Sequence, residues 1–229
     1  MSAFLCKCNR IWKRLFGGLG VCVTFISLCC AHVLYNTQTV EIGHGFYYLL
    51  SEAPTTQATA QFVQLQGGAG YVLTHNKSEY VAYAVYLSAE ESEKARCSLL
   101  ETGDNAMCLG VHCNKLYLKK ASDKRSAAKI KGAFESLYGC IQVLNGEIKR
   151  LEKGATQESD KRILNDLARK LAYLSKDNPL QTVEYAQICN RAAKRITELT
   201  KGVVYVKDLR YVLCETCNDY SKLSKIFSL

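Results

Sequence analysis

The chain has 229 residues, of which 48% are hydrophobic and 22% are charged, and it contains only two prolines. This composition supports a buried core and excludes a chain that is disordered throughout. The net charge of +9 is unevenly distributed, because residues 1–14 carry +4, residues 15–118 carry −4 and residues 119–229 carry +9. This distribution argues against a uniformly basic nucleic-acid-binding protein.

Residues 15–35 form an apolar segment without Asp, Glu, Lys or Arg. As a helix, a segment of this length spans about 31 Å, which matches the hydrocarbon thickness of a bilayer. The four basic residues before it predict a cytoplasmic N-terminus, with the chain from Asn36 onward outside the cell. We favour an uncleaved anchor over a cleaved signal peptide, because Cys29 and His32 fit a cleavage site poorly. The predicted localisation is therefore the cell membrane, crossed once.

Twelve cysteines occur, of which seven follow the predicted membrane segment. Seven is odd, so these thiols cannot all pair within the chain, and we interpret most of them as small buried apolar residues. Cys214 and Cys217 form a CxxC pattern that could serve redox chemistry or supply half of a zinc site, with Cys108, His112 and Cys113 as the other half. The irregular spacing disfavours both functions, so we expect no metal and no cofactor.

Several short segments predict a small α+β domain over about residues 44–120. Residues 46–50 are typical of a strand, whereas residues 53–66 fit either a helix or a second strand. The glycine-rich residues 67–70 predict a turn, and residues 71–73 and 79–87 predict a hairpin.

A helix is expected next, because Ser88-Ala89-Glu90-Glu91 has the pattern of a capping box. Gly103 is a suitable left-handed residue to end that helix. Residues 106–118 then predict a closing strand or hairpin. The expected order is strand, uncertain connector, strand, strand, helix and strand.

The segment YVAYAVYLSAEESEKARCSLLETG, residues 80–103, resembles the second half of a SPOR (sporulation-related repeat) domain. FYYLLSEA, residues 46–53, resembles the first strand of that family, and GGAGYVL, residues 67–73, resembles the entry to the second strand. Under this alignment, residues 53–66 would supply the first helix of the domain.

The resemblance implies an antiparallel sheet with two helices on one face and a glycan-binding second face. The implied ligand is the glycan strand of peptidoglycan, especially where peptide stems have been removed. Strand alternation places Tyr80 and Tyr86 together on one face, and with Tyr47 or Tyr48 they could line that glycan surface. The alternative is that these tyrosines are ordinary sheet residues. The opposite face of the same strand is predicted to be core: Val81, Tyr83, Val85 and Leu87.

The remainder of the chain, residues 121–229, predicts three or four helices. Asn178 and Pro179 predict the start of the third helix, which ends near Gly202. Short links favour an antiparallel bundle or hairpin, and the heptads equally suit self-association. The first helix carries an apolar heptad pattern: Ile130, Phe134, Leu137, Ile141, Leu144, Ile148 and Leu151. The second continues it with Leu164, Leu167, Leu171 and Leu174, and the last carries Leu209, Leu213, Tyr220, Leu223 and Phe227.

The sequence contains no nucleophile, zincin, P-loop or dinucleotide motif, which favours a protein that is not an enzyme. The predicted fold class is α+β, with a cytoplasmic segment 1–14, a transmembrane helix 15–35, a SPOR-like domain 44–120 and a helical region 121–229. The predicted function is non-catalytic binding of peptidoglycan glycan strands during division or sporulation. The alternative is a membrane-anchored scaffold whose helices bind protein partners.

Overall fold

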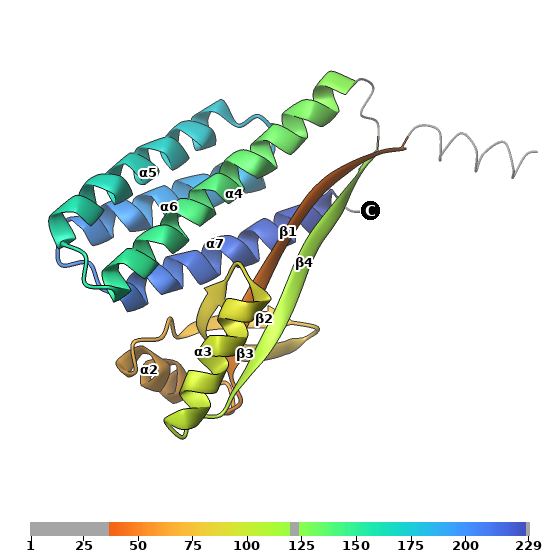
Figure 1. Cartoon of the computed structure of the whole chain (residues 1–229). Helices are drawn as coiled ribbons and strands as arrows, with labels where there is room; N and C mark the ends of the chain where they lie inside the picture. Colours follow the sequence, from red (N-terminus) through yellow and green to blue (C-terminus); the bar gives the residue numbers. More distant parts are fainter. Residues whose placement is uncertain (1–36, 120–123, 228–229) are drawn as a thin grey trace, which may run out of the picture.

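The computed structural model describes residues 37–119 and 124–227, which form an α+β fold (Figure 1). The first part contains a four-stranded antiparallel sheet with two helices, and the second part contains four longer helices. The strands are β1 (Thr37–Ser51), β2 (Tyr71–His75), β3 (Ser78–Tyr86) and β4 (Ala106–Lys119). The helices are α2 (Gln57–Leu65), α3 (Ala89–Glu101), α4 (Lys124–Glu152), α5 (Gln157–Asp177), α6 (Val183–Thr200) and α7 (Val206–Ile226).

The first part has the order β-α-β-β-α-β, with the strands arranged β2-β3-β1-β4 across the sheet. This is the split β-α-β arrangement of ferredoxin-like folds. Helix α2 decides the ambiguous stretch 53–66 in favour of a helix. Thr56 caps it, because its side chain accepts a hydrogen bond from the backbone N–H of Thr59 at 3.0 Å. The predicted hairpin is also confirmed, and its turn residues Asn76 and Lys77 both have positive φ.

Strands β1 and β4 are longer than the sequence patterns predict. They pair from Thr37 with Lys119 to Ser51 with Ala106, so that one end of the sheet continues as a two-stranded ribbon (Figure 1). The sheet therefore begins before the predicted boundary at residue 44. Residues 106–118 belong to a single strand rather than to a hairpin.

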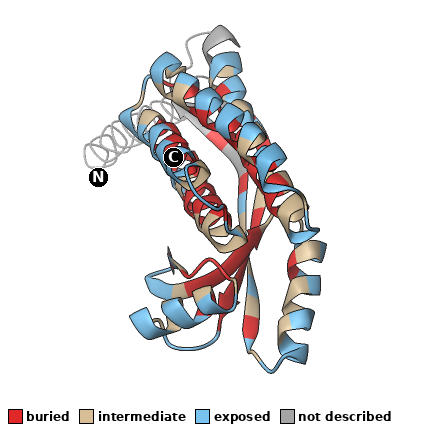
Figure 2. Ribbon diagram, turned by 90° about the vertical axis from the view of Figure 1, so that its left-hand side faces the viewer, coloured by how far each residue is buried: buried red, intermediate tan, exposed pale blue. Residues whose placement is uncertain are grey.

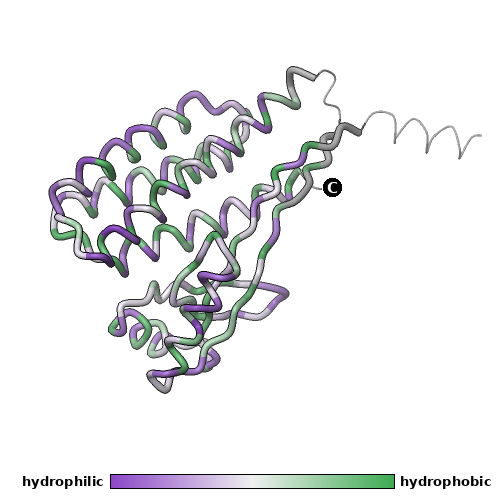
Figure 3. The backbone as a smooth tube through the Cα atoms, in the orientation of Figure 1, coloured by the Kyte–Doolittle hydropathy of each residue, from purple (hydrophilic) through white to green (hydrophobic). Residues whose placement is uncertain are grey.

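The four later helices form an antiparallel bundle, one of the two arrangements that the short links between the predicted helices favour. Most heptad positions of α4 and α5 are buried, Phe134, Leu137 and Ile141 among them, whereas Ile130 and Leu151 are only partly buried. Hydrophobic and hydrophilic residues alternate along each helix (Figure 3). The predicted start of the third helix is wrong. Asn178 instead ends α5 in the left-handed conformation, with φ 36, and its side chain binds the backbone of Thr182.

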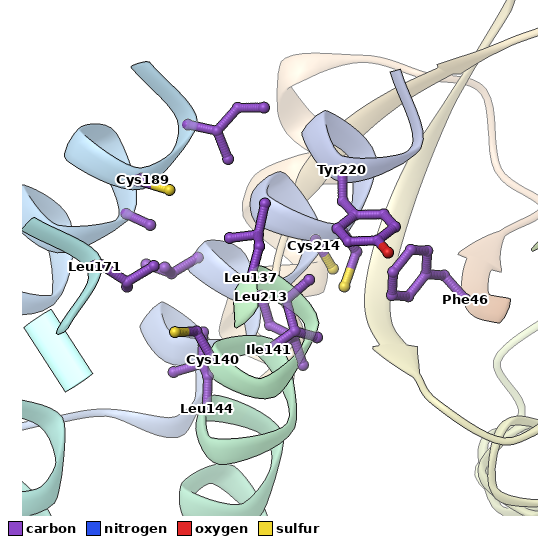
Figure 4. Close-up of a cluster of buried hydrophobic side chains, with 14 of the residues drawn as sticks. Phe46, Leu137, Cys140, Ile141, Leu144, Leu171, Cys189, Leu213, Cys214 and Tyr220 are labelled. Atoms are coloured by element: carbon purple, nitrogen blue, oxygen red, sulfur yellow. The ribbon is translucent and has the colours of Figure 1, made fainter. Parts of the chain in front are cut away.

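The bundle packs on one face of the sheet. Helices α4 and α7 pack on the strands, and a single core runs from the sheet into the centre of the bundle (Figure 2). Figure 4 shows Phe46 of β1 beside Tyr220 of α7, with Leu137 and Ile141 of α4 nearby. The opposite face carries a smaller core beneath α2 and α3: Leu49, Val63, Val81, Tyr83 and Ala106. Both faces of the sheet therefore pack against helices.

A β-bulge in β3 changes the predicted alternation of its side chains. Leu49 pairs with Ala84 but Leu50 pairs with Ala82, so Tyr83 is an extra residue in the strand. Before the bulge, Ala82 faces the bundle and Val81 faces α2 and α3; after it, Val85 faces the bundle. The prediction that Val81, Tyr83, Val85 and Leu87 share one face is therefore wrong.

A pair of carboxyl groups joins α4 to α5 at the end of the bundle distant from the ribbon. Glu147 and Asp160 are both buried and share a hydrogen bond, and Arg150 Nη2 lies 3.2 Å from Asp160 Oδ1. Asp160 Oδ2 has no hydrogen-bond partner in the described part of the chain. Burial raises the pKa of Glu147, and the neighbouring Asp160 raises this pKa further.

We expect Glu147→Gln to stabilise the fold at neutral pH, by about 0.5–2 kcal/mol. A carboxyl whose pKa is raised by folding stabilises the fold most below its unfolded pKa, and this contribution is lost as pH rises through the folded pKa. Glutamine keeps the shape, carries no charge and can donate to Asp160. Urea titrations at neutral and acidic pH measure the effect, with the exposed Glu184→Gln as control. An equal change in stability from both substitutions at neutral pH would count against a raised pKa of Glu147 in the folded protein.

No helix within residues 37–119 and 124–227 is long and apolar enough to cross a membrane. The predicted membrane segment, residues 15–35, lies outside the described residues.

Candidate functional site: the seam cleft

A cleft lies where the α+β part meets the bundle. Its volume is about 300 Å³, and we call it the seam cleft. Helices α3, α4 and α7 and strand β3 line it, so it exists only because the two parts pack together. The lining residues are Ala84, Val85, Tyr86, Glu91, Lys94, Ala95, Ser98, Asn145, Ile148, Lys149, Glu152, Arg210 and Leu213.

Apolar side chains and one tyrosine make up much of the seam cleft. Val85, Ile148 and Leu213 are buried members of the shared core, and Tyr86 ends strand β3 beside them. Burial raises the pKa of Tyr86, although the nearby Arg210 guanidinium opposes this shift. Tyr86 therefore stays neutral at physiological pH, with an aromatic ring for stacking and a hydroxyl for hydrogen bonding.

One ion pair and one hydrogen bond cross the seam, and a second ion pair joins two helices of the bundle beside the cleft. Lys149 of α4 binds Glu91 of α3. Arg210 of α7 binds Glu152 of α4 at 2.8 Å and also donates to the carbonyl of Gly67 at 2.8 Å. Glu91 was predicted to cap α3 together with Ser88, but the Ser88 side chain makes no capping hydrogen bond. The tertiary ion pair has replaced the local capping box.

Asn145 of α4 is a polar residue of the seam cleft. The residue is 8% exposed, lines the cleft, and its side chain makes no hydrogen bond with the described part of the chain. Its amide is not among the fully buried polar groups that lack a partner, so it is open to the cleft. Since it offers both donors and an acceptor, it suits a ligand with hydroxyl or amide groups.

The arrangement of the seam cleft suits binding rather than catalysis. Its carboxylates Glu91 and Glu152 are each paired with a cation, so neither is poised as a general acid or base. Among residues 37–119 and 124–227, no cluster of three or more His, Cys, Asp or Glu side chains could hold a metal ion.

Only one of the four tyrosines predicted to bind glycan lines the seam cleft. Tyr86 does so, whereas Tyr80 is partly buried against the bundle core and Tyr48 is completely buried beneath it. Tyr47 lies outside the cleft and contacts the ring of His112 edge-on, with 5.5 Å between ring centroids. The prediction of an open tyrosine face is wrong for Tyr48, because α4 and α7 occupy that side of the sheet.

A polar contact fixes the ribbon against the bundle. His44 of β1 stacks on the ring of Tyr138, with 3.6 Å between centroids, and its Nδ1 lies 2.6 Å from the hydroxyl of Tyr220. Its Nε2 lies 3.4 Å from a carboxylate oxygen of Glu135. Burial lowers the pKa of His44, and Glu135 partly opposes this. The His44 ring packs against Tyr138 and Tyr220, although the Glu135 side chain is 45% exposed, so we assign the cluster a structural role.

The CxxC cysteines are part of the core. Cys214 and Cys217 lie on α7, are completely buried, and have pKa values raised by burial. All seven cysteines of the described residues are free thiols, of which only Cys97 and Cys108 are exposed.

Neither the sequence patterns nor the resemblance predicted the residues that α4 and α7 bring to the seam cleft, since their partners lie far away in the chain.

Comparison with known proteins returned no matching family model, curated protein or solved structure.

Proposed function

We propose that this chain is a non-catalytic membrane protein that binds peptidoglycan glycan strands in the seam cleft. The observation that carries this proposal is that the ring of Tyr86 and the amide of Asn145 line the same cleft. Sugar rings stack on aromatic side chains, and their hydroxyl and acetamido groups form hydrogen bonds with amides. The volume of about 300 Å³ lies at the lower end of small-ligand sites, which suits one or two sugar rings.

The proposal moves the glycan site away from the face that the SPOR resemblance implies. It keeps the non-catalytic function, the attachment to the cell membrane with the C-terminus outside the cell, and a place in division or sporulation. Peptidoglycan and the membrane are the proposed partners, and no nucleic acid is among them.

Sedimentation of the full chain in mild detergent with purified peptidoglycan tests the proposal. We expect the protein to pellet with the wall, and more so after an amidase has removed the peptide stems. Protein that stays in the supernatant with both preparations would sink the proposal.

Tyr86→Ala tests the site itself. Losing one stacking contact is expected to weaken binding about three- to tenfold. Tyr47→Ala is the matched control, because Tyr47 pairs with Tyr86 across the sheet but lies outside the seam cleft. Equal losses in both variants would place the glycan elsewhere.

Asn145→Ala tests the hydrogen bond that the cleft can offer. We expect binding to fall about three- to tenfold, the usual value of one hydrogen bond. Gln142→Ala, exposed on the same helix, should bind like the unchanged protein. Unchanged binding by Asn145→Ala would show that the Asn145 amide does not form a hydrogen bond with the glycan.

A second function is favoured by the way in which α4 and α7 occupy the sheet face. If the sheet uses that face only to hold the bundle, the whole chain serves as a membrane-anchored scaffold that binds protein partners or a second copy. The sedimentation experiment separates the two functions, because a scaffold of this kind stays in the supernatant.

A further inference from the structure

Strand β4 forms a long open edge of the sheet. Within the described residues it pairs only with β1, and Figure 1 shows it along the outer side of the molecule. Strand β4 has 14 residues, whereas β2 at the opposite edge has 5. Alternate residues of an edge strand direct their backbone N–H and C=O groups away from the sheet. Outside the ladder with β1, no described residue forms a backbone hydrogen bond with residues 106–113, so these groups are available to a further strand.

The edge of β4 lacks the features by which proteins usually prevent edge pairing, which are prolines, charged side chains and bulges. Residues 106–114 contain no proline and no Asp, Glu, Lys or Arg. The irregularity in the β1–β4 ladder lies in β1, where Ile42 and Gly43 stand opposite the single residue Asn114. Strand β1, which forms the other edge of the ribbon, is therefore bulged there, whereas β4 continues regularly. A long, regular and uncharged edge is suited to pairing with another strand.

The middle of β4 is open to solvent. Helix α3 lies over the beginning of the strand, where the hydroxyl of Ser92 donates a hydrogen bond to the thiol of Cys108 at 3.1 Å. Gly110 and His112, farther along the strand, are exposed. Helices that pack on the faces of β4 therefore leave the centre of the strand accessible.

The edge is complementary to itself. Two identical strands that pair antiparallel are related by a twofold axis, and the uncharged segment 106–114 is centred on Gly110. With Gly110 opposite Gly110 of the second copy, Cys108 stands opposite His112, and Leu109 stands opposite Val111. The second of these is an apolar cross-strand pair, and no like charges meet along the segment.

Charges beyond the uncharged segment favour the same register. Lys115 of one copy stands opposite residue 105 of the other, and so comes next to Asp104. Asp104 forms no ion pair with the described residues, and its carboxylate accepts a hydrogen bond from the Gln66 amide at 2.8 Å. Because the axis repeats this arrangement, opposite charges flank the shared ladder at both of its ends.

We propose that two copies of this chain pair antiparallel through β4, with Gly110 on the twofold axis, so that their sheets join into one continuous sheet. Strand β4 contributes no residue to the seam cleft, and each copy therefore keeps its own cleft. The inference depends neither on glycan binding nor on membrane attachment.

Disulfide formation between copies tests the register. Cys108 and residue 112 of one chain lie about 13 Å apart along the strand, whereas a disulfide requires Cα atoms within about 7 Å. A bond between these positions can therefore form only between two copies. We expect the full chain with His112→Cys, in mild detergent with a mild oxidant, to give a covalent dimer in which mass spectrometry identifies the link from Cys108 to position 112. Cys97→Ser removes the other exposed thiol of the described residues.

Thr74→Cys is the matched control for the disulfide, because Thr74 is exposed on the opposite edge strand β2. It should give no link to Cys108. A dimer linked only through other positions, or the absence of a covalent dimer, would overturn the proposed pairing.

Sedimentation velocity of the full chain in mild detergent tests association without an added cysteine. We expect a reversible dimer, and Gly110→Lys should weaken it about fivefold or more, because two lysines would then stand directly opposite each other. A Cβ at Gly110 lies 3.3 Å from the His112 ring, a side chain that can move. Thr74→Lys adds the same charge to β2 and should leave the dimer intact.

Far-UV circular dichroism establishes that both lysine variants are folded, and if Gly110→Lys does not fold, the disulfide result decides alone. A dimer that a folded Gly110→Lys leaves unchanged would place the contact elsewhere and overturn the inference. A chain that is monomeric at every concentration would also overturn it, and would leave the edge of β4 to a strand of a different protein.

Discussion

Phe46→Ala is expected to destabilise the whole chain by about 3–5 kcal/mol, the range found when a buried phenylalanine is removed. Phe46 is completely buried, and its ring meets those of Tyr138 and Tyr220 at centroid distances of 6.2 and 5.3 Å. These contacts join the sheet to both α4 and α7. The loss should therefore lower the stability of sheet and bundle together.

Urea unfolding of the full chain, followed by far-UV circular dichroism for the helices and by the near-UV tyrosine signal, measures this effect. Both signals should move to the same lower midpoint. Phe62→Ala is the control, because Phe62 is 52% exposed on α2, and its loss should change stability by less than about 1 kcal/mol. A bundle that keeps its original midpoint while the sheet melts would show that the two parts are independent.

Gly70→Ala is expected to destabilise the protein by about 2–4 kcal/mol, through a strained backbone and a steric collision. Gly70 has φ +60, and a Cβ there would lie 2.5 Å from Cγ of Gln64 and 2.6 Å from the carbonyl oxygen of Ala60. The second contact is with helix backbone, which cannot move without disturbing α2.

Gly67→Ala provides the matched control for Gly70→Ala. Gly67 has φ +84 in the same turn, but a Cβ there meets nothing within 4 Å. The Gly67→Ala substitution should destabilise the protein only through the strained backbone, by about 1–2 kcal/mol. Thermal unfolding of both variants measures the difference, and equal melting temperatures would show that the collision is relieved at little cost.

The local signals in the sequence were sufficient for most of the secondary structure. Heptad spacing predicts α4 and α5 because those helices bury one continuous stripe, with Leu137 and Leu171 at its centre. The hairpin follows from a polar turn between two apolar strands. Residues 53–66 stayed ambiguous because α2 buries only Val63 fully, which leaves little periodicity to detect.

The packing of the sheet against the bundle could not be predicted in the same way. An uninterrupted apolar strand such as residues 80–87 is typical of a sheet covered on both faces, and this was the available signal. The bulge at Tyr83 has no signature in the sequence, because a strand with an extra residue has the same composition. Tertiary contacts likewise directed Glu91 to Lys149 instead of to its own helix end.

The candidate site depended on these unpredicted contacts. Tyr86 was predicted from its position on β3, but for a different surface. Asn145 and Arg210 come from helices that the sequence does not connect to the sheet. Asn145 and Arg210 are recognised as lining residues only once the fold shows that their helices meet strand β3 at the seam cleft.

Hydrogen exchange of the full chain, with and without soluble peptidoglycan glycan fragments that lack peptide stems, tests most directly whether the seam cleft binds glycan. We predict slower exchange on adding the fragments in residues 84–98 and 145–152, which line the cleft from β3, α3 and α4. The outer helix surface of α5 should not change. Protection confined to residues outside the seam cleft, or no protection in a sample that still binds the fragments, would contradict the proposed site.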